Sequence, residues 1–131
     1  MKTQSAVLAG AIVGMLAVAL GAFGAHAFKA MLIASGRLDT FELAVKYQFY
    51  HALGLVLTGL LQHVFPNSWF RIAAALFLTG IVLFSGSLYL LCFTGATSFA
   101  MITPFGGVAL ISGWALLIGG AWSVHKTKVP S

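Results

Sequence analysis

Four long apolar segments, separated by short polar stretches, dominate the chain. They run from about residue 5 to 27, 47 to 65, 72 to 93 and 104 to 124. Each is close to the ~20 apolar residues that an α-helix needs to cross the hydrocarbon core of a bilayer. Between Arg71 and Lys126 there is no Asp, Glu, Lys or Arg, a pattern foreign to water-soluble domains. We therefore predict an all-α integral membrane four-helix bundle, forming a single transmembrane domain over residues 1–131.

The first apolar segment shares one feature with secretory signal peptides. It follows the basic residue Lys2 and ends in the A-x-A pattern Ala25-His26-Ala27. The apolar core of a signal peptide is usually about 7 to 15 residues, which is shorter than this segment. We expect an uncleaved first helix.

The connection between the first two segments is the longest and carries most of the charge. Met31–Ile33, followed by Gly36, predicts a short interfacial helical element that ends at the glycine. Asp39 with Glu42 three residues later is typical of a capping box at a helix start. Glu42 and Lys46 are spaced i,i+4, which predicts a surface ion pair worth about 0.2–0.5 kcal/mol.

Composition and charge fit this picture. The chain is 60% hydrophobic and 7% charged, with a formal net charge of +5. The basic residues stand singly at the ends of apolar segments, as topology signals do, so no nucleic-acid partner is expected. With four spans both termini share one side, which holds Lys2, Arg71, Lys126 and Lys128; the other side holds Lys29, Arg37 and Lys46. This small majority favours cytoplasmic termini in a multi-pass plasma-membrane protein.

Small residues form stripes on the first and fourth segments. The glycines concerned are Gly10, Gly14 and Gly21 on the first and Gly106, Gly113 and Gly120 on the fourth. Small residues let membrane helices approach closely, and close packing is what holds such helices together in lipid. We expect these stripes to pack inside the bundle; the alternative is an interface in a homo-oligomer.

Polar side chains also occur inside the predicted spans. The second segment carries a stripe formed by Tyr47, His51, Gly54, Thr58 and Gln62, which should point into the bundle because unpaired polar groups are costly in lipid. The topology gathers a wider polar cluster on the side away from the termini: His26, His51, Tyr50, Ser85, Ser87, Tyr89 and Thr103. Hydroxyls in membrane helices commonly bond to backbone or to neighbouring helices, whereas a pair of histidines can relay protons. Both roles remain open.

Catalytic and metal-binding signals are missing from the sequence. There is no nucleophile elbow, phosphate loop or paired carboxylate motif. His26, His51 and Glu42 have no spacing typical of a metal site. The single cysteine, Cys92, excludes an intramolecular disulfide. We expect no catalytic residue, metal or cofactor.

Four local motifs occur in order along the chain. They are GAFGAHA at residues 21–27, YQFYHAL at 47–53, FSGSLYL at 84–90, and TPFGG at 103–107 followed by Gly113-Trp114. Together they resemble the domain of unknown function 423 family, the YgdD-like small inner-membrane proteins, to which the eukaryotic transmembrane protein 256 is similar. The resemblance covers nearly the whole chain and implies a bacterial four-helix membrane protein without an established activity or substrate. It draws attention to the motif residues His26, His51, Ser85, Ser87, Tyr89 and Pro104.

Three functional hypotheses follow. The leading one is an accessory or scaffolding component of a larger membrane complex, suggested by the small size and the glycine stripes. The second is an oligomeric transporter or channel for a small solute, suggested by the polar stripe and the two histidines. The third is a membrane protein that binds a lipid or quinone, which predicts a lipid-sized cleft near His51 and Tyr89.

Overall fold

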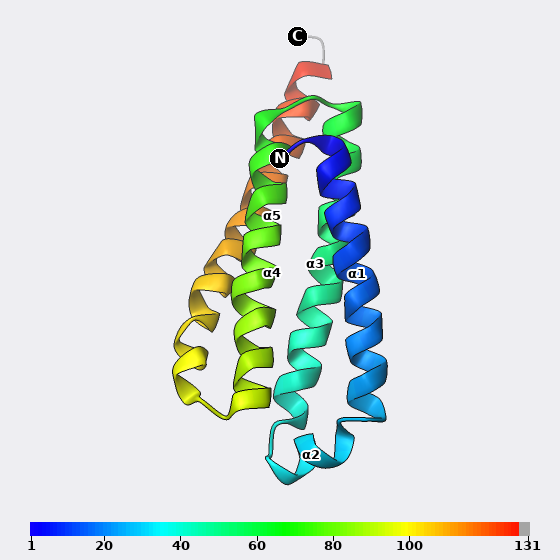
Figure 1. The fold of residues 1–131 in the computed structure, drawn as a ribbon. Helices are drawn as coiled ribbons and strands as arrows, with labels where there is room; N and C mark the ends of the chain where they lie inside the picture. Colours follow the sequence, from blue (N-terminus) through cyan, green and yellow to red (C-terminus); the bar gives the residue numbers. More distant parts are fainter. Residues whose placement is uncertain (129–131) are drawn as a thin grey trace.

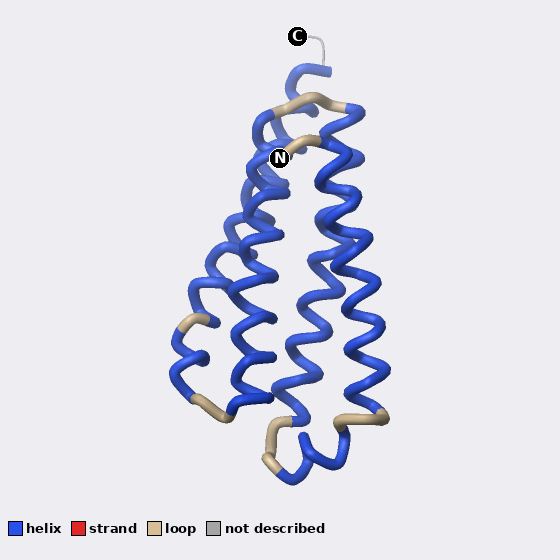
Figure 2. Tube along the Cα trace, viewed as in Figure 1, coloured by secondary structure: helices blue, strands red, loops and turns tan. Residues whose placement is uncertain are grey.

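The computed structural model describes residues 1–128; the last three residues of the predicted domain lie outside this range. Its four long α-helices are α1 (Thr3–Ala25), α3 (Leu38–Val64), α4 (Ser68–Thr94) and α5 (Thr103–Lys128). The short helix α2 (Lys29–Ala34) follows α1, and the 3-10 helix η1 (Thr97–Met101) precedes α5 (Figure 1). Helices make up nearly all of the described chain, and residues 1–128 contain no strand (Figure 2). The predicted fold class, including the short element in the first loop, is confirmed.

Within residues 1–128, three segments are long and apolar enough to cross a membrane: α1, α4 and the Thr97–Lys128 segment that contains α5. Helix α3 is equally long but less hydrophobic, because it carries polar residues such as Gln48, His51 and Gln62. At 1.5 Å per residue α3 is about 40 Å long. It packs between α1 and α4. Its length and position match the second predicted span, at about residues 47–65, which stays a prediction.

The four long helices are arranged as an open row. Helix α1 packs on α3, α3 on α4, and α4 on α5, while α1 touches α4 only slightly. Figure 1 shows this order across the molecule, with the start of α1 and the end of α5 at one end and α2 and η1 at the other. Each outer helix, α1 and α5, therefore has one side covered by protein and the rest exposed.

Glycines allow the close contacts in this row. A Cβ added at Gly10 would lie 2.8 Å from the carbonyl oxygen of Ala52 on α3, and one at Gly106 would overlap the backbone of Phe84 on α4. The remaining glycines of the two stripes also face a neighbouring helix of the same chain: Gly14, Gly21, Gly113 and Gly120. The stripes thus lie inside the row of helices.

Two glycines end helices at the loop end of the row. Gly36 and Gly95 have φ values of +69° and +70°, which favour glycine over residues with a side chain. After α2, the Arg37 N–H donates to the Leu32 carbonyl at 2.8 Å and the Gly36 N–H to Ile33 at 3.1 Å, the pattern of a Schellman motif. The predicted end of the short element at Gly36 is therefore correct.

The predicted capping box in the first loop is wrong. Helix α3 already begins at Leu38, directly after the Schellman turn, so Asp39 lies within its first turn. There the carboxylate still favours the helix through its interaction with the helix dipole. Glu42 and Lys46 are both exposed and form no ion pair within residues 1–128. Water and lipid head groups compete for such exposed charges, so little holds the pair together.

Candidate functional site

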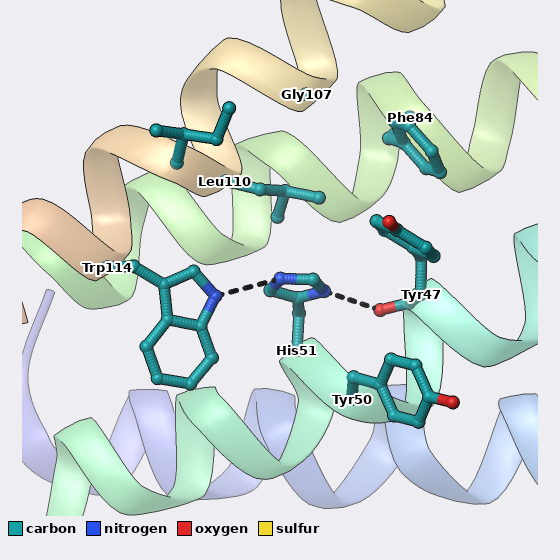
Figure 3. A pocket seen from close by; sticks show the side chains of 8 residues that line it. Tyr47, Tyr50, His51, Phe84, Gly107, Leu110 and Trp114 are labelled. Carbon is teal, nitrogen blue, oxygen red and sulfur yellow. Dashed lines mark hydrogen bonds between the residues drawn. The ribbon is translucent and has the colours of Figure 1, made fainter.

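An open groove of about 600 Å³ lies between α3 and α5, with Phe84 of α4 at its side (Figure 3). Its lining is almost wholly aromatic and aliphatic. The lining residues are Tyr47, Tyr50, His51, Phe84, Gly107, Leu110, Ile111 and Trp114. The groove contains two residues of the predicted polar cluster, His51 and Tyr50.

His51 joins α3 to α5. Its ring is 5% exposed, Nδ1 lies 2.7 Å from the Tyr47 carbonyl oxygen, and Nε2 lies 3.1 Å from Nε1 of Trp114 (Figure 3). A carbonyl only accepts and an indole N–H only donates. The geometry therefore assigns the proton to Nδ1 and makes Nε2 the acceptor, so a neutral imidazole has both nitrogens engaged. Phe77 packs beside it, with ring centroids 5.7 Å apart.

A second polar connection joins three helices. The Tyr89 hydroxyl on α4 donates to Oε1 of Gln48 on α3 at 2.6 Å, and Nε2 of Gln48 donates to the Val13 carbonyl on α1 at 2.9 Å. Gln48 was not among the predicted site residues. Its signal was an amide side chain inside an apolar segment, where an unpaired polar group is costly.

The hydroxyls of the predicted cluster connect neighbouring helices. Ser85 donates to the Ala44 carbonyl on α3 at 2.7 Å. Ser87 and Thr103 share a 2.7 Å hydrogen bond between α4 and the first residue of α5. For these hydroxyl groups the geometry supports a structural role, which is hydrogen bonding between neighbouring helices.

The structure does not bring His26 to the other cluster residues. His26 is exposed at the end of α1. Gly24 packs on Phe41 and Gly10 on Ala52, so the antiparallel register puts His26 roughly 18 Å from His51 along the bundle. No hydrogen bond or ring contact joins the two histidines in the described chain. Residues 1–128 also contain no group of three or more His, Cys, Asp or Glu side chains placed to hold a metal ion.

Comparison with known proteins places the chain in a family. The family described as "Protein of unknown function (DUF423)" matches residues 20–107. The UPF0382 membrane protein of Staphylococcus saprophyticus is 41% identical over 118 residues, which cover 90% of this chain and 97% of that protein. The inner membrane protein YgdD of Escherichia coli is 35% identical over 129 residues, 98% of each chain. The chain belongs to the DUF423 (UPF0382) family.

The match confirms the family resemblance predicted from the four motifs. A further DUF423 relative, the membrane protein YwdK of Bacillus subtilis, is 41% identical over 116 residues, covering 88% of this chain and 94% of YwdK. No solved structure matches the chain. The DUF423 match contains His51, Gln48 and Tyr89 but ends before Trp114. The bond between His51 and Trp114 thus links the matched part to the rest of α5.

Proposed function

We propose that this DUF423 protein is a small accessory or scaffolding component of a complex in the bacterial plasma membrane, with no catalysis of its own. One observation carries the proposal: within residues 1–128 every buried polar residue is hydrogen-bonded inside the chain. These residues are Gln48, His51, Thr58, Ser85 and Ser87. Among the buried side-chain polar atoms of residues 1–128, Oε1 of Gln62 alone lacks a hydrogen-bond partner, and a single amide oxygen does not make a catalytic or solute-coordinating site.

The surface available to a partner is the exposed side of the two edge helices, α1 and α5. Exposed apolar side chains on α1 include Leu8, Met15 and Val18, each more than 60% exposed. On α5, Ile118 and Trp122 are comparably exposed. Lipid tails can cover such surfaces, but an open row with two long apolar edges also suits side-by-side packing against the helices of a partner.

Transport by a single copy has less support. Two residues of the polar stripe predicted on α3 are already hydrogen-bonded within the chain. His51 bonds to Trp114, and Thr58 bonds to the carbonyls of its own helix. An open row of four helices also encloses no central path. A channel or transporter would need several copies arranged around a pore.

The proposal also includes the membrane in which the chain lies and its orientation there. YgdD is named an inner membrane protein, and we place this chain in the corresponding plasma membrane. The start of α1 and the end of α5 lie at one end of the row (Figure 1). That end has Lys2, Arg71, Lys126 and Lys128, which favours a cytoplasmic location for it.

Gentle extraction from the native membrane tests the proposal. The tagged full-length chain is purified in a mild detergent and its assemblies are weighed by native mass spectrometry. We expect a defined complex with other polypeptides. Met15→Trp on α1 and Ile118→Trp on α5 each add bulk to one edge, and one of the two should release the partner. A partner-free monomer or homo-oligomer would refute the accessory role.

A further inference from the structure

Two adjacent glycines of α5 have different surroundings. A Cβ at Gly106 would collide with the backbone of Phe84, so this glycine serves helix packing. A Cβ at Gly107 would meet only Cδ2 of Phe84, at 3.9 Å. Gly107 lines the groove between α3 and α5. The missing side chain at Gly107 therefore widens the groove and is not required by the packing of α5 on α4.

The depth of the groove follows from the register of the helices. The Ser85–Ala44 hydrogen bond and the packing of Phe77 on Gly54 fix α4 against α3. In this register the exposed residues Lys46 and Arg71 lie roughly 20 Å apart along the bundle. Their side chains lean toward opposite ends, because Cα–Cβ bonds point toward the helix N-terminus, and so can reach the two head-group layers.

His51 lies about midway between these two charged levels. Trp114, bonded to it, closes the groove near the middle of the apolar band. Tyr47 and Gly107 lie about one turn nearer the loop end of the row. The groove therefore extends roughly 10 Å from the bilayer centre toward the head groups of the leaflet on the loop side, a depth occupied by the terminal part of a lipid tail.

The chemistry of the lining limits what the groove can bind. None of its eight residues is charged, and its volume of about 600 Å³ falls within the ~300–1,000 Å³ range of small-molecule sites. The imidazole of His51 and the indole N–H of Trp114 are bonded to each other and cannot bind a ligand as well. These features exclude ions and strongly polar solutes and suit a hydrocarbon chain.

Two phenol groups remain for the polar end of such a ligand. Tyr47 stacks on Phe84, with ring centroids 4.6 Å apart, and Tyr50 is 56% exposed at the groove edge. Neither hydroxyl has a hydrogen-bond partner among residues 1–128. In Figure 3 the Tyr50 hydroxyl points away from Trp114, along α3 toward its loop end.

We propose that the groove between α3 and α5 binds one lipid of the loop-side leaflet, with a hydrocarbon tail along Gly107 and Trp114. The occupant is a phospholipid: its acyl chain fills the groove, and its ester group lies beyond Tyr50 toward the head groups. The inference goes beyond the accessory role and does not depend on it.

The preference for one bound lipid has to come from packing. A lipid tail in the bilayer is already in hydrocarbon, so burial from water contributes nothing. The rigid aromatic walls instead provide contacts that mobile neighbouring lipids do not. A side chain placed at Gly107 would occupy the same space and remove this advantage.

Photo-crosslinking tests the site in a bilayer. The full chain is reconstituted in phosphatidylethanolamine–phosphatidylglycerol vesicles containing a phospholipid with a diazirine in one acyl chain, and adducts are mapped by mass spectrometry. In the wild type we expect about tenfold more adduct on Ile111 and Trp114 than on Val108, an outward-facing residue of α5 at similar depth, which corresponds to ~1.4 kcal/mol. Equal labelling of these three residues would overturn the proposal.

Two glycine variants provide the matched comparison. Gly107→Leu fills the groove and should bring the labelling ratio to about one. Gly86→Leu makes the same change on α4, at a glycine whose added Cβ would have no neighbour within 4 Å, and it should keep the wild-type ratio. If Gly107→Leu fails to fold, Ile111→Trp blocks the groove instead, from its exposed wall. The adduct on Trp114 is then compared with the adduct on Val108. If the blocking variant left the ratio of adduct on the groove residues to adduct on Val108 unchanged, the proposed site would be refuted.

Native mass spectrometry then identifies the lipid. A retained mass found with the wild type and Gly86→Leu, and lost in the blocked variant, supports the proposal. We expect a phospholipid mass; a quinone mass in its place would overturn the assignment. If the wild type instead retained a second copy of the chain, and the blocked variant lost it, the groove would be a protein interface. That result would overturn the proposal.

Discussion

His51 illustrates what a single polar residue does inside this bundle. A histidine in an apolar helix suggests proton transfer or metal binding when only the sequence is known. In the structure the ring is fixed between the Tyr47 carbonyl and the Trp114 indole, and His26 lies far from it. The residue therefore connects α3 to α5 and closes the end of the groove.

Removal of the bond between His51 and Trp114 should measurably loosen α5. Trp114→Phe deletes the indole N–H while keeping an aromatic ring, and His51→Leu deletes the acceptor. We expect a coupling energy on the order of 0.6–1.7 kcal/mol between the two substitutions, the range seen for hydrogen bonds between membrane helices. Unfolding of the four proteins of this double-mutant cycle in mixed micelles measures it. Strictly additive effects would show that the bond contributes nothing to stability.

At the scale of elements, the contact between α4 and α5 depends on small residues at one face of α5. Gly106, Gly113 and Gly120 recur every seven residues and meet Phe84, Phe77 and Phe70 in turn. The rings of Phe77 and Phe70 pack into the gaps left by Gly113 and Gly120, whereas at Gly106 the α4 backbone itself comes close to α5. In lipid this shape complementarity replaces the hydrophobic effect as the source of helix association.

The neighbours Gly106 and Gly107 should respond oppositely to the same substitution. Gly106→Ala pushes a methyl group into the α4 backbone and forces the helices apart, at a cost of about 1–3 kcal/mol. Gly107→Ala meets open space and should stabilise α5 by up to ~1 kcal/mol through helix propensity. Thermal unfolding of both variants in the same detergent measures the difference. Equal destabilisation would mean that the predicted difference in packing is wrong.

At the scale of the whole molecule, our proposal gives the row of helices an orientation. The end with the start of α1 faces the cytoplasm, and the end with α2 and η1 faces outward. The basic residues differ only slightly between the two ends, so the orientation rests on a small bias. The polar connections through Gln48 and His51 tie all four long helices together. We therefore expect the chain to insert in one orientation as a unit.

Cysteine labelling in intact cells tests this orientation. The native thiol is first removed by Cys92→Ala, and Ser98→Cys then places a thiol in η1 at the loop end. A membrane-impermeant maleimide added from outside should label Ser98→Cys but not a matched variant with Thr127→Cys near the C-terminus. The reverse labelling pattern would place the termini outside.

The sequence by itself determined that the chain is a membrane protein with four long helices, because apolar segments of this length have few alternatives in water. It also indicated the short element ending at Gly36 and the small faces of α1 and α5, since glycine spacing along a helix is a local property. The capping box at Asp39 was predicted wrongly because a turn that closes on Leu32 set the start of α3.

Only the tertiary structure decided how the polar residues are used. Gln48, His51 and Tyr89 find partners on other helices, and these pairings depend on the register and order of the helices. Topology alone suggested a meeting of His26 and His51, but the antiparallel register of α1 and α3 separates them. The groove beside Gly107 likewise exists only because α5 packs on α4 and leaves α3 uncovered there, an arrangement that no local pattern in the sequence specifies.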